Sequence, residues 1–366
     1  MYLTATKLSL VNFRSYAKAE FGLSEHTVFV GPNAVGKTNL LEALYVLASG
    51  KSFRADRELE MIRWGETQAR IELGLTRDDI SHTLTAELSA GSRTVSKRFL
   101  VDTNRRRAKE LGAFAPMVLF SADDIRLVDG APGRRRRALD LAIGQSSPAY
   151  HEASGRYARA LASRNRVLEQ IHTGEATQTE LEVWDDQLVG AGQTLIDERI
   201  RFAEYANAQL TERYAAIAET STKPTAKSTD LAMAYEPLTT DLAADLPERR
   251  AQDLAVGTTT IGPHRDDWRL LLGNRPLSSF GSGGEYRSAM LALRMAEAAW
   301  IDAEVGVRPI LLLDDVFSEL DAARRAALLG HLPESQVIIT TPEAGVLPKS
   351  FASEATVVDL GDKSRV

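Results

Sequence analysis

The chain has 366 residues, of which 44% are hydrophobic and 26% charged, a composition typical of a globular protein with a large core and room for two domains. It contains no cysteine, which excludes a disulfide framework and a thiolate metal site and fits a reducing, cytoplasmic setting. The formal net charge is −6, so any contact with nucleic acid must depend on local basic patches.

The ends and apolar runs of the sequence show no feature of an exported or membrane protein. The N-terminal stretch is charged, which argues against a secretion signal; its charged residues are Lys7, Arg14, Lys18, Glu20 and Glu25. The longest apolar runs, such as residues 310–313, are far too short to span a bilayer. We therefore expect a cytoplasmic protein with no membrane partner.

The first third of the chain is dominated by predicted strands. Alternating apolar residues predict them over 2–11, 19–23, 28–30, 69–75, 83–88, 98–101 and 117–120. Turn-like breaks between the later ones indicate an antiparallel sheet. Residues 39–47 are expected to form a helix.

A phosphate-binding loop lies between the strand at 28–30 and this helix. Its pattern of two glycines followed by Lys and Thr is formed by Gly31, Pro32, Asn33, Ala34, Val35, Gly36, Lys37 and Thr38. The glycines permit backbone angles that turn successive N–H groups toward a phosphate, at the positive end of a helix dipole. Lys37 can reach the β- and γ-phosphates, and the Thr38 hydroxyl can ligate Mg²⁺. The loop predicts a site for ATP and Mg²⁺, which includes Asn39.

The middle of the sequence changes to helical periodicity at about residue 137. Apolar residues at helical spacing predict a first long helix that ends near 172–175 and a second that extends from about 184 to 214. We expect an antiparallel helical arm over 137–230 between two halves of a head, 1–136 and 231–366. Helices that only cover the sheet are the alternative. Residues 220–230 are interpreted as a connector.

The last third adds two further elements of a nucleotide site. The apolar run 310–313 predicts a buried strand that ends in Asp314 and Asp315, the pattern of a Walker B strand. Asp314 would hold Mg²⁺, and Asp315 would orient or deprotonate the attacking water. A second glycine-rich loop opens a helix at Gly281, Ser282, Gly283, Gly284 and Glu285. Since one nucleotide needs only one glycine-rich phosphate-binding loop, the second loop is expected to bind the nucleotide of a partner subunit.

The ordered set of motifs resembles the ABC-type ATPase heads of the SMC superfamily, and within it the RecF family. The resemblance covers essentially the whole chain. Its specific stretches are NFRSY from Asn12, GPNAVGKTNLLEALYVLASGKSFR from Gly31, FSADDIRLVDGAPGRRRRALD from Phe120, GPHRDD from Gly262 and LLLDDVFSELD from Leu311. It implies an α/β fold, with a mixed phosphate-loop sheet, an antiparallel β lobe and an inserted helical arm.

Further residue roles are implied by the resemblance. Arg14 is expected on the nucleoside side, and Arg54 in the basic loop after the phosphate-loop helix. Ser282 to Glu285 would form a signature loop that acts in trans on the γ-phosphate. Asp123 and Asp124 fall near the position of the Q-loop of ABC heads.

Some residues differ from ABC transporters or are ambiguous. Gly281 replaces the usual start of the signature loop, and Thr341 stands where transporters have a switch His. Asp315 occupies the position usually held by Glu, which suits a slow ATPase. His264 is interpreted as a structural turn residue, with a catalytic base as the less favoured reading.

Two arginine runs are interpreted as contacts to the DNA backbone, with solvated surface as the alternative. They are Arg105, Arg106 and Arg107, and Arg134, Arg135, Arg136 and Arg137; Arg164 and Arg166 are expected to extend the patch.

The sequence as a whole predicts an ATP-gated DNA clamp with weak, DNA-stimulated ATPase activity. Two copies would meet head to tail around two ATP molecules on double-stranded DNA near a single-strand gap, and hydrolysis would release them. The resemblance implies RecR and the RecO pathway as partners, in support of recombinase loading, and a nucleoid-associated location. The alternatives are the ATPase subunit of a membrane transporter and a short SMC-like chromosome protein, although the transporter would keep a Gln-centred Q-loop and the switch His.

Overall fold

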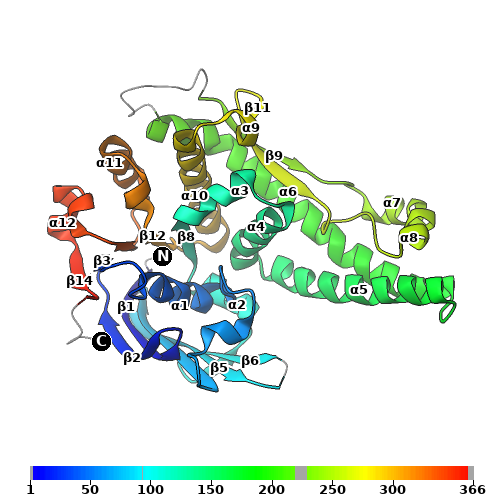
Figure 1. Cartoon of the computed structure of the whole chain (residues 1–366), viewed down its shortest axis with the longest axis horizontal. Coiled ribbons are helices and arrows are strands. Elements are labelled where there is room, and N and C mark those ends of the chain that lie inside the picture. Colours follow the sequence, from blue (N-terminus) through cyan, green and yellow to red (C-terminus); the bar gives the residue numbers. More distant parts are fainter. Residues whose placement is uncertain (1–2, 93, 219–228, 362–366) are drawn as a thin grey trace.

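An antiparallel sheet forms the lower lobe of the computed structural model, which describes residues 3–92, 94–218 and 229–361 (Figure 1). Its six strands lie in the order β2-β1-β4-β5-β6-β7. They are β1 (Leu3–Phe13), β2 (Tyr16–Gly22), β4 (Gln68–Arg77), β5 (Ile80–Ala90), β6 (Val95–Val101) and β7 (Asn104–Arg106). The predicted antiparallel sheet is confirmed.

A second sheet is parallel and carries the phosphate loop. Its five strands lie in the order β14-β3-β13-β12-β8, and each neighbouring pair is parallel. They are β3 (His26–Val30), β8 (Met117–Ser121), β12 (Ile310–Asp314), β13 (Val337–Thr341) and β14 (Thr356–Asp359). Among the described residues, parallel and antiparallel pairing therefore lie in separate sheets, where one mixed sheet was expected beside the antiparallel lobe.

Helix α1 (Lys37–Ser49) lies between these two sheets. Alternation along β12 divides the two sides of the parallel sheet, because successive side chains of a strand point to opposite faces. Ile310 and Leu312 pack in the core that contains α1, and Leu311 and Leu313 pack in a second core on the other side. Burial on nearly all sides explains why α1 is apolar around most of its circumference.

Shorter helices and a small sheet complete the head. The helices are η1 (Glu58–Met61), α2 (Ala108–Phe114), η2 (Ala122–Ile125), α3 (Arg126–Asp129), α4 (Pro132–Ser146), α9 (Leu277–Phe280), α10 (Gly283–Val305), η4 (Val316–Glu319), α11 (Ala322–His331), η5 (Ala344–Val346) and α12 (Lys349–Glu354). The small sheet has the order β11-β10-β9, from β9 (Leu231–Glu236), β10 (Asp267–Leu272) and β11 (Arg275–Pro276). Helix α4 begins at Pro132, so the predicted boundary at 137 falls inside a helix.

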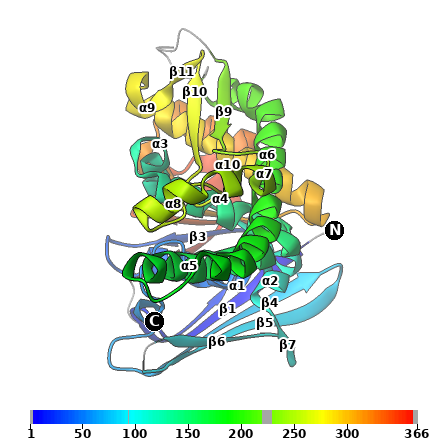
Figure 2. The ribbon, with the colours of Figure 1, turned by 90° about the vertical axis from the view of Figure 1, so that its right-hand side faces the viewer.

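Two long helices form an arm that projects from the head, and Figure 2 looks along it. They are α5 (Pro148–Thr173) and α6 (Glu182–Ala218), joined through η3 (Gln178–Leu181). Helix α5 ends at Gly174, whose left-handed φ of 78° suits a glycine cap. The predicted pair of long helices is confirmed, whereas most of the predicted connector at 220–230 lies outside the described residues. No helix in the described ranges has the length and apolarity needed to cross a membrane.

The chain between β9 and β10 belongs to the arm, although the sequence assigned it to the head. It forms α7 (Leu242–Glu248), which packs on α6, and α8 (Arg250–Val256), which packs on α5. In Figure 1 both helices lie over the arm, far from the six-stranded and five-stranded sheets. Helices α7 and α8 were not predicted, because short helices show little apolar periodicity in the sequence.

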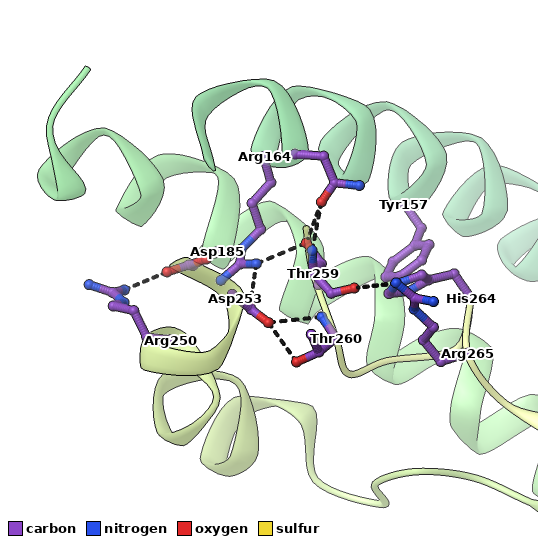
Figure 3. Close-up of polar contacts among 10 residues, drawn as sticks. Tyr157, Arg164, Asp185, Arg250, Asp253, Thr259, Thr260, His264 and Arg265 are labelled. Carbon is purple, nitrogen blue, oxygen red and sulfur yellow. Dashed lines mark hydrogen bonds and ion pairs between the residues drawn. The ribbon is translucent and has the colours of Figure 1, made fainter. Parts of the chain in front are cut away.

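A buried ion-pair cluster attaches α8 to the arm (Figure 3). Arg164 is fully buried and donates through Nε to Asp185 at 2.6 Å and through Nη1 to Asp253 at 2.6 Å. The same Nη1 lies 2.8 Å from the Thr259 hydroxyl. The prediction that Arg164 extends a DNA-binding patch is therefore wrong, because its charge is already neutralised inside the protein. Arg166 remains exposed on the same helix.

We expect Arg164→Ala to destabilise the arm strongly, since it leaves the Asp253 carboxylate buried without its cation. Breaking a buried pair in this way costs about 3–5 kcal/mol. Chemical unfolding followed by fluorescence and circular dichroism measures the loss. Arg166→Ala is the matched control on the same helix and should change stability by less than about 0.5 kcal/mol. Equal effects of the two substitutions would contradict the structural role given to Arg164.

Candidate nucleotide-binding site

Four parallel strands end at the same edge of the five-stranded sheet. The register places Asp314 beside Thr340 of β13 and Ser121 of β8, and it places Thr341 beside Val30 of β3. Segments that lie far apart in the sequence, including the phosphate loop and the Asp-Asp pair, therefore meet at one edge. Ligands of open α/β sheets bind outside this carboxyl edge.

The phosphate loop is shaped by a close contact with the β1–β2 turn. Gly36 has a φ of 111°, and a Cβ there would lie 2.9 Å from both the Ser15 hydroxyl and the Tyr16 hydroxyl. Only glycine fits this conformation and this space. Helix α1 begins at the next residue, Lys37, so its free N–H groups face the loop as an anion site requires.

Lys37 is held inside the loop that it is expected to serve. Its side chain is buried, and Nζ donates to the carbonyl oxygens of Gly31 at 2.6 Å and Pro32 at 3.0 Å. These carbonyls satisfy the ammonium group in the absence of an anion. A bound phosphate would exchange them for stronger, charge-assisted hydrogen bonds.

Thr38 and Asp314 connect the phosphate loop to the Walker B strand. The Thr38 hydroxyl donates to Asp314 Oδ1 at 3.0 Å, and the Thr340 hydroxyl donates to the same oxygen at 2.8 Å. Burial raises the pKa of the Asp314 carboxyl, and the two hydroxyls act against this rise. A hydroxyl beside a buried carboxylate fits Mg²⁺, which prefers such oxygen ligands and takes the rest from phosphate and water. In the described part of the chain no cluster of three or more His, Cys, Asp or Glu side chains forms a metal site of its own.

Asp315 follows in a constrained backbone conformation. Its φ is 53°, in the left-handed region that Asp tolerates better than most residues, and its N–H donates to the Thr340 carbonyl at 3.1 Å. Its carboxylate accepts a hydrogen bond of 2.5 Å from the Ser318 hydroxyl. The carboxylates of Asp314 and Asp315 therefore have different hydrogen-bond partners. This difference fits the two separate roles predicted for them.

A buried carboxylate, Glu42, joins the two arginines expected at the nucleotide. Arg14 donates to it through Nε at 2.8 Å and Nη2 at 2.6 Å, and Arg54 donates through Nε at 3.0 Å. The Ser52 hydroxyl adds a bond of 2.6 Å. Arg54 also donates to the side chain of Asn39. Glu42 was not predicted as a site residue, although a lone acid inside an apolar helix is a signal for it.

The cavity beside these residues has a volume of about 750 Å³. Its lining includes Thr38, Arg54, Asp314, Asp315 and Arg134. Three predicted binding residues, Thr38, Arg54 and Asp314, and the predicted catalytic Asp315 therefore face one space. Residues 31–37 of the phosphate loop, Arg14 and the loop Ser282–Glu285 are not part of this lining.

The second glycine loop forms the start of α10. The Ser282 hydroxyl accepts from the Glu285 N–H at 3.3 Å, and the Glu285 carboxylate accepts from the Ser282 N–H at 2.6 Å, a capping box. Gly281 has no room for a side chain, because a Cβ would lie 2.8 Å from the Leu277 carbonyl oxygen and 2.6 Å from Tyr286. This contact explains the departure from a larger residue at Gly281.

The predicted Q-loop residues differ in their surroundings. Asp124 forms a two-pronged ion pair with Arg294 of α10, at 2.7 and 3.0 Å, and Arg294 also donates to Glu297. The side chain of Asp123 is largely exposed. Asp124 therefore links the end of β8 to the helix that the second glycine loop opens.

The run Arg134–Arg137 divides into different environments. Arg135 is buried and forms two hydrogen bonds of 2.7 Å with Asp267, so the prediction that it contacts DNA is wrong. Arg136 donates to the Asp266 carbonyl at 2.8 Å, and Arg137 donates to the Ser52 carbonyl at 2.9 Å. Arg134 is exposed.

The other run, Arg105 to Arg107, is exposed throughout on β7 and the turn after it. Arg106 and Arg107 lie 3.6 Å from the Glu110 carboxylate, too far to hold them firmly. These three side chains stay available to a phosphate backbone.

His264 is enclosed by hydrogen bonds, as its interpretation as a turn residue requires. Its Nε2 lies 3.0 Å from the Thr259 carbonyl and must donate, so its Nδ1 accepts from the Tyr157 hydroxyl at 2.6 Å. Burial lowers the pKa of His264 to about 4, which keeps the ring neutral near pH 7.

We expect Lys37→Met and Asp315→Asn to act on different steps. Lys37→Met should weaken ATP binding itself, because the ammonium group faces the phosphates. Asp315→Asn should retain ATP binding and lower turnover by roughly 100-fold or more, the contribution of a general base. Equilibrium dialysis and phosphate release separate the two effects. Turnover at the wild-type level in either variant would show that the site is assigned wrongly.

Comparison with known proteins places the chain in a family. A model described as the RecF/RecN/SMC N terminal domain matches residues 4–360. The DNA replication and repair protein RecF of Heliobacterium modesticaldum is 39% identical over 354 residues, 91% of each chain. RecF of Moorella thermoacetica is 36% identical over 366 residues, with 98% of this chain and 95% of that protein covered.

Solved structures agree with this result. The recombination mediator protein RecF with ATPrS, of the RecFOR pathway, has a TM-score of 0.85 at 25% identity, with 98% of this chain and 97% of that chain covered. The Smc head domain of Pyrococcus furiosus, with a TM-score of 0.53 at 16% identity and coverage of 98% and 93%, shows likeness of fold alone. The predicted family is confirmed: the chain belongs to the RecF family of DNA replication and repair proteins and has the ABC-type ATPase head fold shared with SMC proteins.

Proposed function

We propose that this chain is an ATP-dependent DNA-binding protein of recombinational gap repair. The observation that carries the proposal is the 3.0 Å hydrogen bond between Thr38 and Asp314, which joins the phosphate loop to the Walker B strand beside a cavity of nucleotide size. Relatives named for DNA replication and repair, and RecF structures described with ATP, support the same reading.

The nucleotide chemistry follows from the groups at the sheet edge. Lys37 and the backbone N–H groups of residues 33–36 would hold the phosphates, with Asn39, Arg14 and Arg54 around the rest of the nucleotide. Thr38 and Asp314 would hold Mg²⁺, which supplies charge neutralisation between the β- and γ-phosphates. Asp315 would orient the attacking water and accept its proton. We expect weak ATPase activity that DNA stimulates.

The active form would be an ATP-dependent dimer. In a symmetric head-to-tail pair, the loop Ser282–Glu285 of one copy would contact the γ-phosphate bound by the other. The exposure of Ser282 and Gly283 at the start of α10 supports this arrangement. Binding of ATP would hold the dimer on double-stranded DNA, and hydrolysis would release it.

DNA would be held by its backbone. The exposed Arg105, Arg106, Arg107 and Arg134 are the contacts that the structure leaves available, with part of the Arg136 and Arg137 guanidinium groups. Contacts of this kind position a duplex without reading its sequence. We propose gapped duplex as the substrate, RecR with the RecO pathway as partners, and the cytoplasm as the location. The division into a head and an inserted arm at 137–230 is part of the proposal, with α7 and α8 added to the arm.

We expect Ser282→Arg to prevent ATP-dependent dimerisation while ATP still binds the monomer. The long cation would occupy the space of the partner's γ-phosphate. Sedimentation velocity with and without ATP and gapped duplex measures the association. Ser81→Arg, at an exposed position of β5, is the control and should dimerise normally. A Ser282→Arg dimer of wild-type affinity would refute the trans role, and loss of ATP binding as well would indicate misfolding instead.

We expect Arg134→Ala to weaken duplex binding and to reduce the salt dependence of the affinity. Each lost phosphate contact lowers the slope of log K against log [salt] by about 0.9. The triple substitution of Arg105, Arg107 and Arg134 should lower it by about two to three. Fluorescence anisotropy at several salt concentrations gives the slopes. Lys18→Ala, an exposed position of β2 outside both runs, should leave the slope unchanged. Unchanged slopes in the arginine variants would identify them as solvated surface.

A further inference from the structure

A second cavity lies between the head and the base of the arm. Its volume is about 550 Å³, and its walls come from the loop after α1, from α4, from α5 and α6, and from the turn before β10. The wall on the arm side is fixed, because Tyr157 and His264 in it are joined by a hydrogen bond and His264 is held by Thr259 (Figure 3). The cavity is therefore built from rigid elements on that side.

The acidic groups of this cavity are mostly neutralised by the protein itself. Asp140 accepts from Arg199 at 2.7 Å and from the Tyr150 hydroxyl, and Glu58 accepts from Lys97. Asp56 is the remaining acid of the lining, and it is exposed at the mouth that leads toward the nucleotide cavity. The electrostatic potential in the cavity is consequently determined mainly by its positively charged side chains.

Several donors in the cavity lack partners. Lys51 and His151 make no side-chain hydrogen bond within the described residues. Arg136 uses Nη1 for the Asp266 carbonyl, and Arg137 uses Nη2 for the Ser52 and Ala55 carbonyls. Each guanidinium group thus keeps its Nε and its other terminal nitrogen for a ligand.

The surroundings of His151 confirm the sign of the field. Burial lowers the pKa of His151, and the positive charges of Lys51, Lys109 and Lys97 lower it further. Lys97 and Lys109 are themselves paired with Glu58 and Glu152. Lys51 is the lysine of this group that remains unpaired within the described residues, and it lies on an exposed loop.

We infer that this cavity is a second phosphate-binding site, separate from the phosphate loop and formed by Lys51, Arg136, Arg137, His151 and Ser154. Its donors come from three elements and converge on one space. A phosphate group offers acceptor oxygens in several directions, and guanidinium groups match it with two parallel hydrogen bonds. A planar carboxylate would use fewer of these donors.

The site adjoins the nucleotide cavity. Asp56, Gly133, Arg137 and Leu141 line both spaces, so one arginine lies between the two. The phosphate could come from the DNA backbone or from a free phosphate compound. The assignment of the phosphate to the DNA backbone rests on the proposed function, whereas its assignment to a free phosphate compound does not.

The test uses the full chain with Lys51→Glu, Lys51→Arg and the control Lys18→Glu. Lys51 and Lys18 are both exposed and without a side-chain hydrogen bond in the described residues, so the two Glu variants carry the same charge change at different places. Calorimetric titration with inorganic pyrophosphate should show two classes of site in the wild type. Lys51→Glu should lose one class, Lys37→Met the other, and Lys18→Glu neither. Lys51→Arg should retain both.

The second measurement of the test is the binding of a fluorescent duplex. If the phosphate belongs to the DNA backbone, Lys51→Glu should lower the duplex affinity by about threefold or more and reduce the salt slope, while Lys18→Glu should not. Loss of the pyrophosphate class with unchanged duplex binding would assign the site to a free phosphate compound. If Lys51→Glu matches Lys18→Glu in both titrations, the inference is overturned. If the wild type binds no duplex, the proposed function fails, and the pyrophosphate titration still decides the site.

Discussion

The candidate site depends on the alignment of parallel strands at one edge of the five-stranded sheet. Asp314 lies in register with Thr340 on one side and Ser121 on the other, and the strand before the phosphate loop ends beside Thr341. A shift of β12 by one residue would exchange its two faces and move its apolar side chains to the wrong cores. Packing of both faces therefore fixes the position of the Asp314 carboxylate relative to Thr38.

The same reasoning explains the importance of α1. Because it lies between two sheets, it cannot rotate without disturbing its packing against both of them, and its N-terminus is held at the sheet edge. Glu42 is a buried charge in this helix, and such a charge is tolerated only with partners. Arg14, Ser52 and Arg54 supply them from the β1–β2 turn and from the loop after α1. One carboxylate thus orders the β1–β2 turn, which contacts the phosphate loop, and the loop after α1, which lines the nucleotide cavity.

The sequence predicted well what is local and poorly what depends on distant partners. Contiguous motifs, strand alternation and helical periodicity were sufficient for the phosphate loop, the Walker B strand, the antiparallel sheet and the two long helices, but not for the purely parallel pairing of the five-stranded sheet or for the small sheet β11-β10-β9. Arg135 and Arg164 look like any other surface arginines in the sequence, because their partners Asp267 and Asp253 occur much further along the chain. Helices α7 and α8 were missed because each has only seven residues, too few for the buried Leu242 and Leu246 of α7 or the Asp253 ion pair of α8 to show in the sequence pattern.

Helix α4 connects the nucleotide cavity to the base of the arm. One of its arginines, Arg135, is fixed to β10 through Asp267, and its Asp140 accepts from Arg199 of α6. Arg199 also donates to the Pro263 carbonyl at 2.8 Å, so α4, α6 and the turn before β10 share one buried polar cluster. Such a cluster resists relative motion because any displacement would leave a charge buried without its partner. Arg134 and Arg137 extend from the same helix toward the nucleotide cavity. A change in the position of α4 when a nucleotide binds would therefore move the base of the arm with it.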